Sequence, residues 1–345
     1  PAAMLWQLRT ITSGEVAVRL QGRGRLPLRA PADEGDAADI PERASNPPGK
    51  VVTPNSSPNG VAQKAKIGTA PKRGFGTPEQ VAALLASVQQ THPNLATRPQ
   101  VRMMVAASDR IAGRLRESEN GFRSVLSLEN SSWSRAAETE LILLGRSRST
   151  MASNLSARRA SMKPRLDGHL DDEAWQGVRP TSLRSALFDD EGWPAEVMVT
   201  HDDGFIYFAA TCVKANQASY GASDAPRPRD PDLSNNDRVE LLIDIDRDYA
   251  SYYRLTVDHR GWTAESCLGD STWNPEWYVA ANETETAWTI EVAIAKQDLV
   301  LPNDQARTVW GLGLQRIVPG VGFQSWTQPS SIEVRPEGFG CLTLE

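Results

Sequence analysis

From residue 162 to its end, the chain consists of short runs of β-branched and aromatic residues separated by turn residues. Glu196–Thr200 and Phe205–Val213, for example, flank His201–Gly204, an arrangement typical of a hairpin. Runs this short and closely spaced leave little room for helices between strands. They predict a mainly β domain over residues 162–345, an antiparallel β-sandwich of the jelly-roll type. Further strands are expected at residues 238–245, 252–258, 262–267, 287–294, 308–317 and 339–344.

The residues before 162 differ in composition and divide into four segments. Residues 1–30 hold a possible β-hairpin, interpreted as the tail of an upstream region. Residues 31–76 are rich in Pro, Asp, Asn, Gly and Lys, and such a stretch buries too little apolar surface to offset its ordering entropy. A disordered linker is therefore expected there. Residues 77–145 predict a small helical segment, and residues 146–161 a second linker.

The helical segment opens with a capping pattern, Thr77-Pro-Glu-Gln80, which places Pro at the first helical position. A second helix is expected from about Gln100 to Glu117, and a third over Ser132–Leu144. The basic residues of the second helix are expected on a solvated face rather than at a nucleic-acid site. They are Arg102, Arg110, Arg114 and Arg116.

Charge is distributed unevenly along the chain. Residues 1–150 contain 20 Lys and Arg against 13 Asp and Glu, whereas residues 151–345 contain 17 against 30. The acidic C-terminal part lacks the clustered cations that neutralise phosphates, so no nucleic-acid partner is expected. The sequence contains no apolar run of about 18 residues, so no transmembrane segment is expected. The first residues lack the pattern of a signal peptide, and we expect a processed or truncated piece of a longer protein.

Four blocks of residues in the predicted β domain occur in the order typical of one family. The blocks are Lys163–Trp175, Val197–Phe208, Asn236–Asp244, and Trp288–Ile294 followed by Trp310–Arg316 and Phe339-Gly340. Together they resemble the family 9 carbohydrate-binding modules and the wider DOMON-like sandwiches, over about residues 162–345. The resemblance implies non-catalytic binding of cellulose- or xylan-class sugars by a module of a larger exported, carbohydrate-degrading protein. It also implies a secreted, periplasmic or cell-surface location.

Three polar positions correspond to sugar-contacting residues of that family: Glu240, Arg254 and Gln315. An Arg fork donates to the two oxygens of a sugar diol, and a carboxylate accepts from hydroxyls. Glu240 belongs to a strand that alternates Val239, Leu241 and Ile243 on one face with Glu240, Leu242 and Asp244 on the other. A structural hydrogen bond to a neighbouring strand is the alternative role for Glu240.

The family's two aromatic clamp positions fall on Ser234 and at or beside Val334, and neither is aromatic. The C–H faces of a sugar need a flat apolar partner. Tryptophans near predicted turns are the candidate substitutes, because binding residues concentrate in loops. The main candidates are Trp273, Trp277 and Trp326, and Trp193 and Trp262 are two others.

Two cofactors are considered. Asp244, Asp246 and Asp248 alternate in the sequence DIDRD, and oxygen ligands at this spacing could hold calcium. The resemblance also implies structural calcium, while an ordinary acidic turn is the alternative. The second cofactor considered is haem, bound through Met198, His201 and His259, because some domains of the DOMON-like group bind haem.

The sequence shows no Ser–His–Asp order, phosphate loop or HExxH motif, so no catalytic residue is assigned. Cys212, Cys267 and Cys341 are the three cysteines. Their odd number leaves at least one unpaired, and any pairing of the others stays open. The principal alternative to sugar binding is a structural or protein-interaction sandwich that retains the fold without the sugar site.

Overall fold

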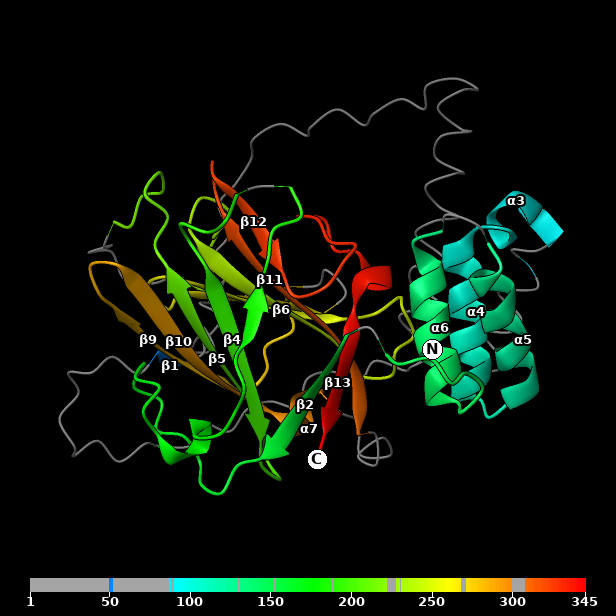
Figure 1. The fold of residues 1–345 in the computed structure, drawn as a ribbon, viewed down its shortest axis with the longest axis horizontal. Coiled ribbons are helices and arrows are strands. Elements are labelled where there is room, and N and C mark those ends of the chain that lie inside the picture. Colours follow the sequence, from blue (N-terminus) through cyan, green and yellow to red (C-terminus); the bar gives the residue numbers. More distant parts are fainter. Residues whose placement is uncertain are drawn as a thin grey trace, which may run out of the picture.

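The computed structural model describes residues 50–51, 87, 90–128, 131–151, 153–187, 189–221, 228–229, 231–267, 271–299 and 308–345. In the described residues 13 strands form one hydrogen-bonded sheet, 11 of them along a single path, and this sheet folds into two facing layers (Figure 1). The first layer runs β1-β9-β10-β5-β4 with β3 beside β4, and the second runs β13-β11-β6-β7-β8 with β12 beside β11. Strand β2 joins them by parallel pairing with β13 and β4. The predicted β-sandwich is confirmed.

The first layer contains β1 (Lys50–Val51), β3 (Thr181–Leu183), β4 (Ala195–His201), β5 (Phe205–Val213), β9 (Trp277–Glu283) and β10 (Ala287–Ala295). The second contains β6 (Arg238–Asp244), β7 (Tyr253–Asp258), β8 (Thr263–Cys267), β11 (Val309–Val318), β12 (Gly322–Ser325) and β13 (Gly340–Leu344). The linking strand β2 spans Asn154–Arg159. Within residues 196–344, every strand range expected from the sequence corresponds to one of these strands, whereas β1, β2, β3, β9 and β12 were not predicted.

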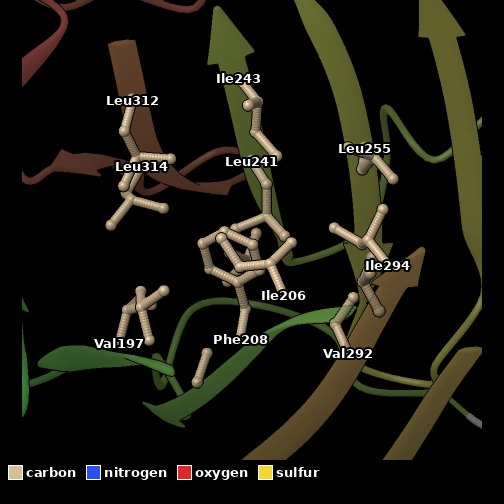
Figure 2. Close-up of a cluster of buried hydrophobic side chains, with 14 of the residues drawn as sticks. Val197, Ile206, Phe208, Leu241, Ile243, Leu255, Val292, Ile294, Leu312 and Leu314 are labelled. Atoms are coloured by element: carbon tan, nitrogen blue, oxygen red, sulfur yellow. The ribbon is translucent and has the colours of Figure 1, made fainter. Parts of the chain in front are cut away.

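The hydrophobic core lies between the two layers, where their inner faces meet (Figure 2). In β6 the alternation predicted from the sequence is confirmed, because Val239, Leu241 and Ile243 belong to this core. Burying one such side chain stabilises the fold by about 1.5–3 kcal/mol. Figure 2 shows Val197, Ile206, Phe208, Val292 and Ile294 of the first layer facing Leu241, Ile243, Leu255, Leu312 and Leu314 of the second.

Before the sandwich come α3 (Pro93–Ala96), α4 (Pro99–Ile111), α5 (Leu115–Leu126) and α6 (Trp133–Leu143). The last three pack side by side next to the end of the second layer (Figure 1). The helix expected over 132–144 is confirmed as α6. The single helix expected over 100–117 is wrong, because α4 ends before Gly113, whose φ of 77° is left-handed, and α5 begins just beyond it.

The helices are attached to the sandwich through a buried carboxylate of α6. Glu140 lies 3.0 Å from Arg110 Nε and 2.8 Å from Arg247 Nε, and it accepts a 2.9 Å hydrogen bond from the Tyr249 hydroxyl. Arg110 also donates to the carbonyl oxygens of Asp246 and Arg247. The expectation that Arg110 is solvated is therefore wrong. Its side chain is only 11% exposed.

Other expectations for the first 161 residues fall partly outside the described structure. The hairpin within residues 1–30 and the capping pattern at residues 77–80 lie outside the described residues. Of the expected linker 31–76, only Lys50 and Val51 are described, and they pair with β9. The expected linker 146–161 is corrected, because it contributes β2 to the sandwich. Among the described helices, none has the length and apolar character needed to span a bilayer.

Candidate functional site

The outer face of the second layer carries the polar residues singled out in the sequence. Along β6, Glu240 alternates with the core residues Val239 and Leu241, so its side chain lies on the opposite face. The register pairs Glu240 with Gln315 of β11 and with Thr256 of β7, and it pairs Leu242 with Arg254. Strand pairing therefore brings the three predicted residues to one part of this face.

Glu240 is the centre of this cluster and is completely buried. Its Oε1 accepts from Arg254 Nη2 at 2.6 Å and from Arg238 Nε at 3.1 Å, and its Oε2 accepts from Gln315 Nε2 at 2.9 Å. The structural role considered for Glu240, a hydrogen bond to neighbouring strands, is therefore present. The carboxylate holds Arg254 and Gln315 in place rather than facing solvent itself.

Arg254 is the accessible member of the cluster. Its side chain is 35% exposed, while that of Glu240 is 0% exposed. Among the described residues its guanidinium donates a hydrogen bond only to Glu240, which leaves its other N–H groups available to a ligand. Because Arg254 is anchored at one nitrogen, it presents these donors in a defined direction.

Tyr252 lies beside Arg254 and was not identified from the sequence. The pKa of its phenol is raised, mainly by burial; the Arg254 charge lowers this pKa and the Glu240 charge raises it. The phenol therefore lies close enough to both charged groups of the cluster to interact with them. Its ring contacts Phe339, and among the described residues its hydroxyl takes part in no hydrogen bond. The only signal in the sequence was its position two residues before Arg254, on the same side of an extended strand.

Phe339 completes the apolar part of this face. Its ring lies edge-on to that of Tyr252, with 6.0 Å between the ring centres. Gly313 makes room for Phe339, because a Cβ at that position would lie 2.8 Å from Phe339 Cε1 and 3.1 Å from Leu242 Cδ1. Tyr252 therefore links the Arg254 charge, which acts on its phenol, to the Phe339 ring, although neither aromatic residue occupies a clamp position identified from the sequence.

The three tryptophans proposed as platforms do not join this cluster. Trp277 is corrected to a core residue, because it is 2% exposed and lies within the sandwich core. Trp273 packs against Tyr253, whose side chain faces the core side of β7, opposite Arg254. Trp326 also packs against the core, and its ring lies against Gly340. Trp193, one of the further candidates, is buried as well.

The three aspartates of the DIDRD sequence converge at the end of β6. One side-chain oxygen from each of Asp244, Asp246 and Asp248 lies within 4.8 Å of the others. Burial and the neighbouring carboxylates raise the pKa of Asp244, and burial followed by the Asp246 charge raises that of Asp248 to about 7. Asp244 and Asp248 also accept backbone N–H groups of their own loop. The three carboxylates supply the oxygen ligands and negative charge that suit a hard cation.

The residues considered for haem have separate partners. His201 Nε2 lies 2.9 Å from the backbone oxygen of Glu345, and His259 packs edge-on against the Tyr220 ring. Met198 packs with Trp175 and Tyr207 on the outer face of the first layer. Within the described residues, the structure brings no two of Met198, His201 and His259 into contact.

The fold and this cluster define a β-sandwich domain with a largely buried polar cluster on the outer face of one sheet layer, from which the Arg254 side chain is partly exposed. Residues 166–344 match the family described as "Carbohydrate family 9 binding domain-like". The matched range covers more than half of the chain and includes Glu240, Arg254, Gln315, Tyr252 and Phe339. The chain belongs to this family.

Two solved structures of a family 9 carbohydrate binding module from Caldicellulosiruptor kristjanssonii are similar to this chain. The complex with cellotriose is 19% identical with a TM-score of 0.41, and the match covers 56% of this chain and 93% of that one. The complex with glucose is 19% identical with a TM-score of 0.39, covering 55% and 95%. A sequence comparison with curated proteins finds no match.

Proposed function

We propose that this protein binds carbohydrate, without catalysis, on the outer face of its second sheet layer. The ligand is an oligosaccharide or polysaccharide of the cellulose or xylan class. The observation that carries this proposal is the Arg254 guanidinium, anchored on Glu240 and close to Tyr252, whose ring packs edge-on against Phe339 within the residues matched to the family. Family membership supports the ligand class.

The chemistry of this face suits a neutral sugar. Free N–H groups of Arg254 donate to adjacent hydroxyl oxygens of a pyranose, and the Tyr252 hydroxyl can donate to or accept from another. The Tyr252 and Phe339 rings offer apolar surface to the C–H face of the ring. Glu240 acts as a positioning residue, because its carboxylate accepts a hydrogen bond from Arg254. Gln315 is a second positioning residue, because it donates to the other oxygen of the same carboxylate.

The biological setting is part of the same proposal. A non-catalytic module of this family suits a larger exported protein, secreted, periplasmic or at the cell surface, whose other parts degrade polysaccharide. Binding through such a module keeps an enzyme at high local concentration on its substrate.

Calorimetric titration of the whole chain with cellotriose and xylotriose tests the proposal. We expect binding to wild type and at least a tenfold loss of affinity in Arg254→Ala. The control is Arg116→Ala, an exposed arginine of α5, which should bind like wild type. Unfolding midpoints establish that each variant is folded. Equal affinity in wild type and Arg254→Ala would overturn the site.

The second candidate function is a structural or protein-interaction domain. Two observations favour it: Ser234 and Val334 are not aromatic, and Trp277 and Trp326 pack into or against the core. If folded wild-type protein bound no member of a broad panel of neutral and acidic glycans, this second function would replace sugar binding.

We also propose that Asp244, Asp246 and Asp248 hold one structural calcium ion. The convergence of their oxygens supports this assignment. A divalent cation would offset the mutual repulsion of three close carboxylates, two of which are buried.

A further inference from the structure

A groove of about 630 Å³ lies between β2, β4 and the segment that precedes β3. It forms because β2 pairs with β4 only at Arg158↔Thr200 and Arg159↔His201, whereas its first residues pair with β13. Leu155 and Val199 are buried lining residues, and the segment 177–181 forms the opposite side. Its volume lies in the range of sites that take small ligands.

The charged side chains that line the groove are basic, although the protein here is acidic and the Glu345 carboxylate lies against Ser156 at the groove. Its lining includes Arg158 and Arg179 and no acidic residue. Both arginines are exposed, and neither guanidinium has a partner in the described part of the chain. The neighbouring Arg159, in contrast, is paired with Asp203. Two free guanidinium groups lining one groove form a site for an anion, because each can bind a carboxylate through two parallel hydrogen bonds.

The other lining groups favour a sugar over a bare anion. Asn154 uses its side-chain oxygen to accept from Thr343, which leaves its amide N–H groups available. Thr181 adds a hydroxyl, and Leu155 and Val178 add apolar surface. The Ser156 hydroxyl is already used, since it donates to Glu345. Neutral donors and apolar surface next to two cations match a ring that carries hydroxyls and one carboxylate.

We propose that this groove is a second binding site, selective for acidic sugars, in which Arg158 and Arg179 bind the carboxylate of a uronic acid. The site goes beyond the neutral-sugar face proposed above and lies on different strands. One wall, β2, precedes residues 166–344 and so lies outside the range matched by the family.

The proposal is tested by titrating the whole chain with trigalacturonate and monitoring binding by calorimetry or by chemical-shift changes. We expect wild type to bind, and the double variant Arg158→Gln, Arg179→Gln to lose at least tenfold in affinity. Arg116→Ala is the control for removal of an exposed charge and should bind like wild type. Because both substituted residues are exposed, the unfolding midpoint of the double variant should stay close to that of wild type.

Three results would overturn the proposal. The first is no binding of trigalacturonate by folded wild type. The second is a loss of binding in Arg254→Ala with unchanged binding in the double variant, which would place the acidic sugar on the neutral-sugar face. The third is inorganic phosphate binding as tightly as trigalacturonate with the same dependence on the two arginines, which would define an unselective anion site. Each result is independent of whether cellotriose binds.

Discussion

At the scale of single residues, Arg316 of β11 and Arg254 of β7 show how burial separates a structural ion pair from a proposed binding group. Arg316 and Gln315 are adjacent on β11 but point to opposite faces. Arg316 lies inside the sandwich, where it donates to both carboxylate oxygens of Asp237 and to the carbonyls of Trp193 and Val213. All its donors face protein, whereas Arg254 keeps donors for a ligand.

The Arg316→Met variant should be strongly destabilised. Arg316 and Asp237 are both 0% exposed in their side chains, and removing one member leaves a buried carboxylate without its partner. We expect a loss of about 3–5 kcal/mol in the free energy of unfolding, measured with denaturant. Arg254→Ala should cost much less, because Glu240 keeps Arg238 and Gln315. Similar losses in both variants would contradict this distinction.

The cysteines give a second prediction at this scale. The structure forms no disulfide between any of the three. Burial raises the pKa of Cys212 to about 12 and that of Cys341 to about 11, and the thiolate is the reactive form. We therefore expect the folded protein to react with a thiol reagent at pH 8 quickly at Cys267 only, and the unfolded protein at all three. Rapid reaction of Cys212 or Cys341 in folded protein would contradict their burial.

At the scale of helices and strands, sequence patterns predicted the elements whose neighbours are close in sequence or whose apolar residues alternate clearly. β4, β5, β6 and α6 are examples. β9 was missed because Asn274 and Pro275 precede it and favour a loop. β2 was missed because its residues, Asn-Leu-Ser-Ala-Arg-Arg, are mostly polar and its partners β13 and β4 lie far away in the sequence. Long-range pairing decides such strands, and local propensity does not reveal it.

In the candidate site, the polar residues were predicted from the sequence and the aromatic residues were not. The family positions of Glu240, Arg254 and Gln315 led to three residues that the structure places together. The tryptophans were misassigned because proximity to a turn does not determine which face a side chain occupies. Trp277 begins β9 and faces the core. Phe339 reaches the site only because Gly313 leaves space on β11, a contact between distant residues that no local pattern shows.

The attachment of α6 to the sandwich gives a prediction with a defined pH dependence. Burial by itself would raise the pKa of Glu140, but the charges of Arg110 and Arg247 and two hydrogen bonds lower it overall. A carboxyl whose pKa is lower in the folded state stabilises the fold above its unfolded pKa. That contribution is lost as the pH falls through the folded pKa.

We expect Glu140→Gln to lower the free energy of unfolding by about 3 kcal/mol at pH 7, because two arginines lose their buried partner. The difference between variant and wild type should shrink as the pH falls below about 4.5, the ordinary value for glutamate. Urea unfolding at several pH values measures both effects. Glu138→Gln, on the same helix, is the control. A difference that stays constant between pH 7 and pH 3 would contradict the predicted ionisation.

At the scale of the whole molecule, the loop after β6 is where the helices and the sandwich meet. Its backbone accepts hydrogen bonds from Arg110 of α4, and its Arg247 and Tyr249 reach Glu140 of α6. The same loop carries Asp246 and Asp248. A cation held by these carboxylates would therefore stabilise the junction between the two parts of the protein as well as the end of β6.

The calcium proposal predicts a rise in the unfolding temperature of the whole chain when calcium is added to chelator-treated protein. A ligand at 100 times its dissociation constant stabilises the folded state by about 2.7 kcal/mol. Asp246→Asn should abolish the shift, since it removes one of three ligands and is only partly buried. Asp171→Asn, an exposed aspartate outside this loop, should retain it. Magnesium at the same concentration should have a smaller effect, because it demands a stricter octahedral geometry than these side chains and their loop provide. An equal shift in Asp246→Asn and wild type would show that calcium acts elsewhere and that the three aspartates form an ordinary acidic turn.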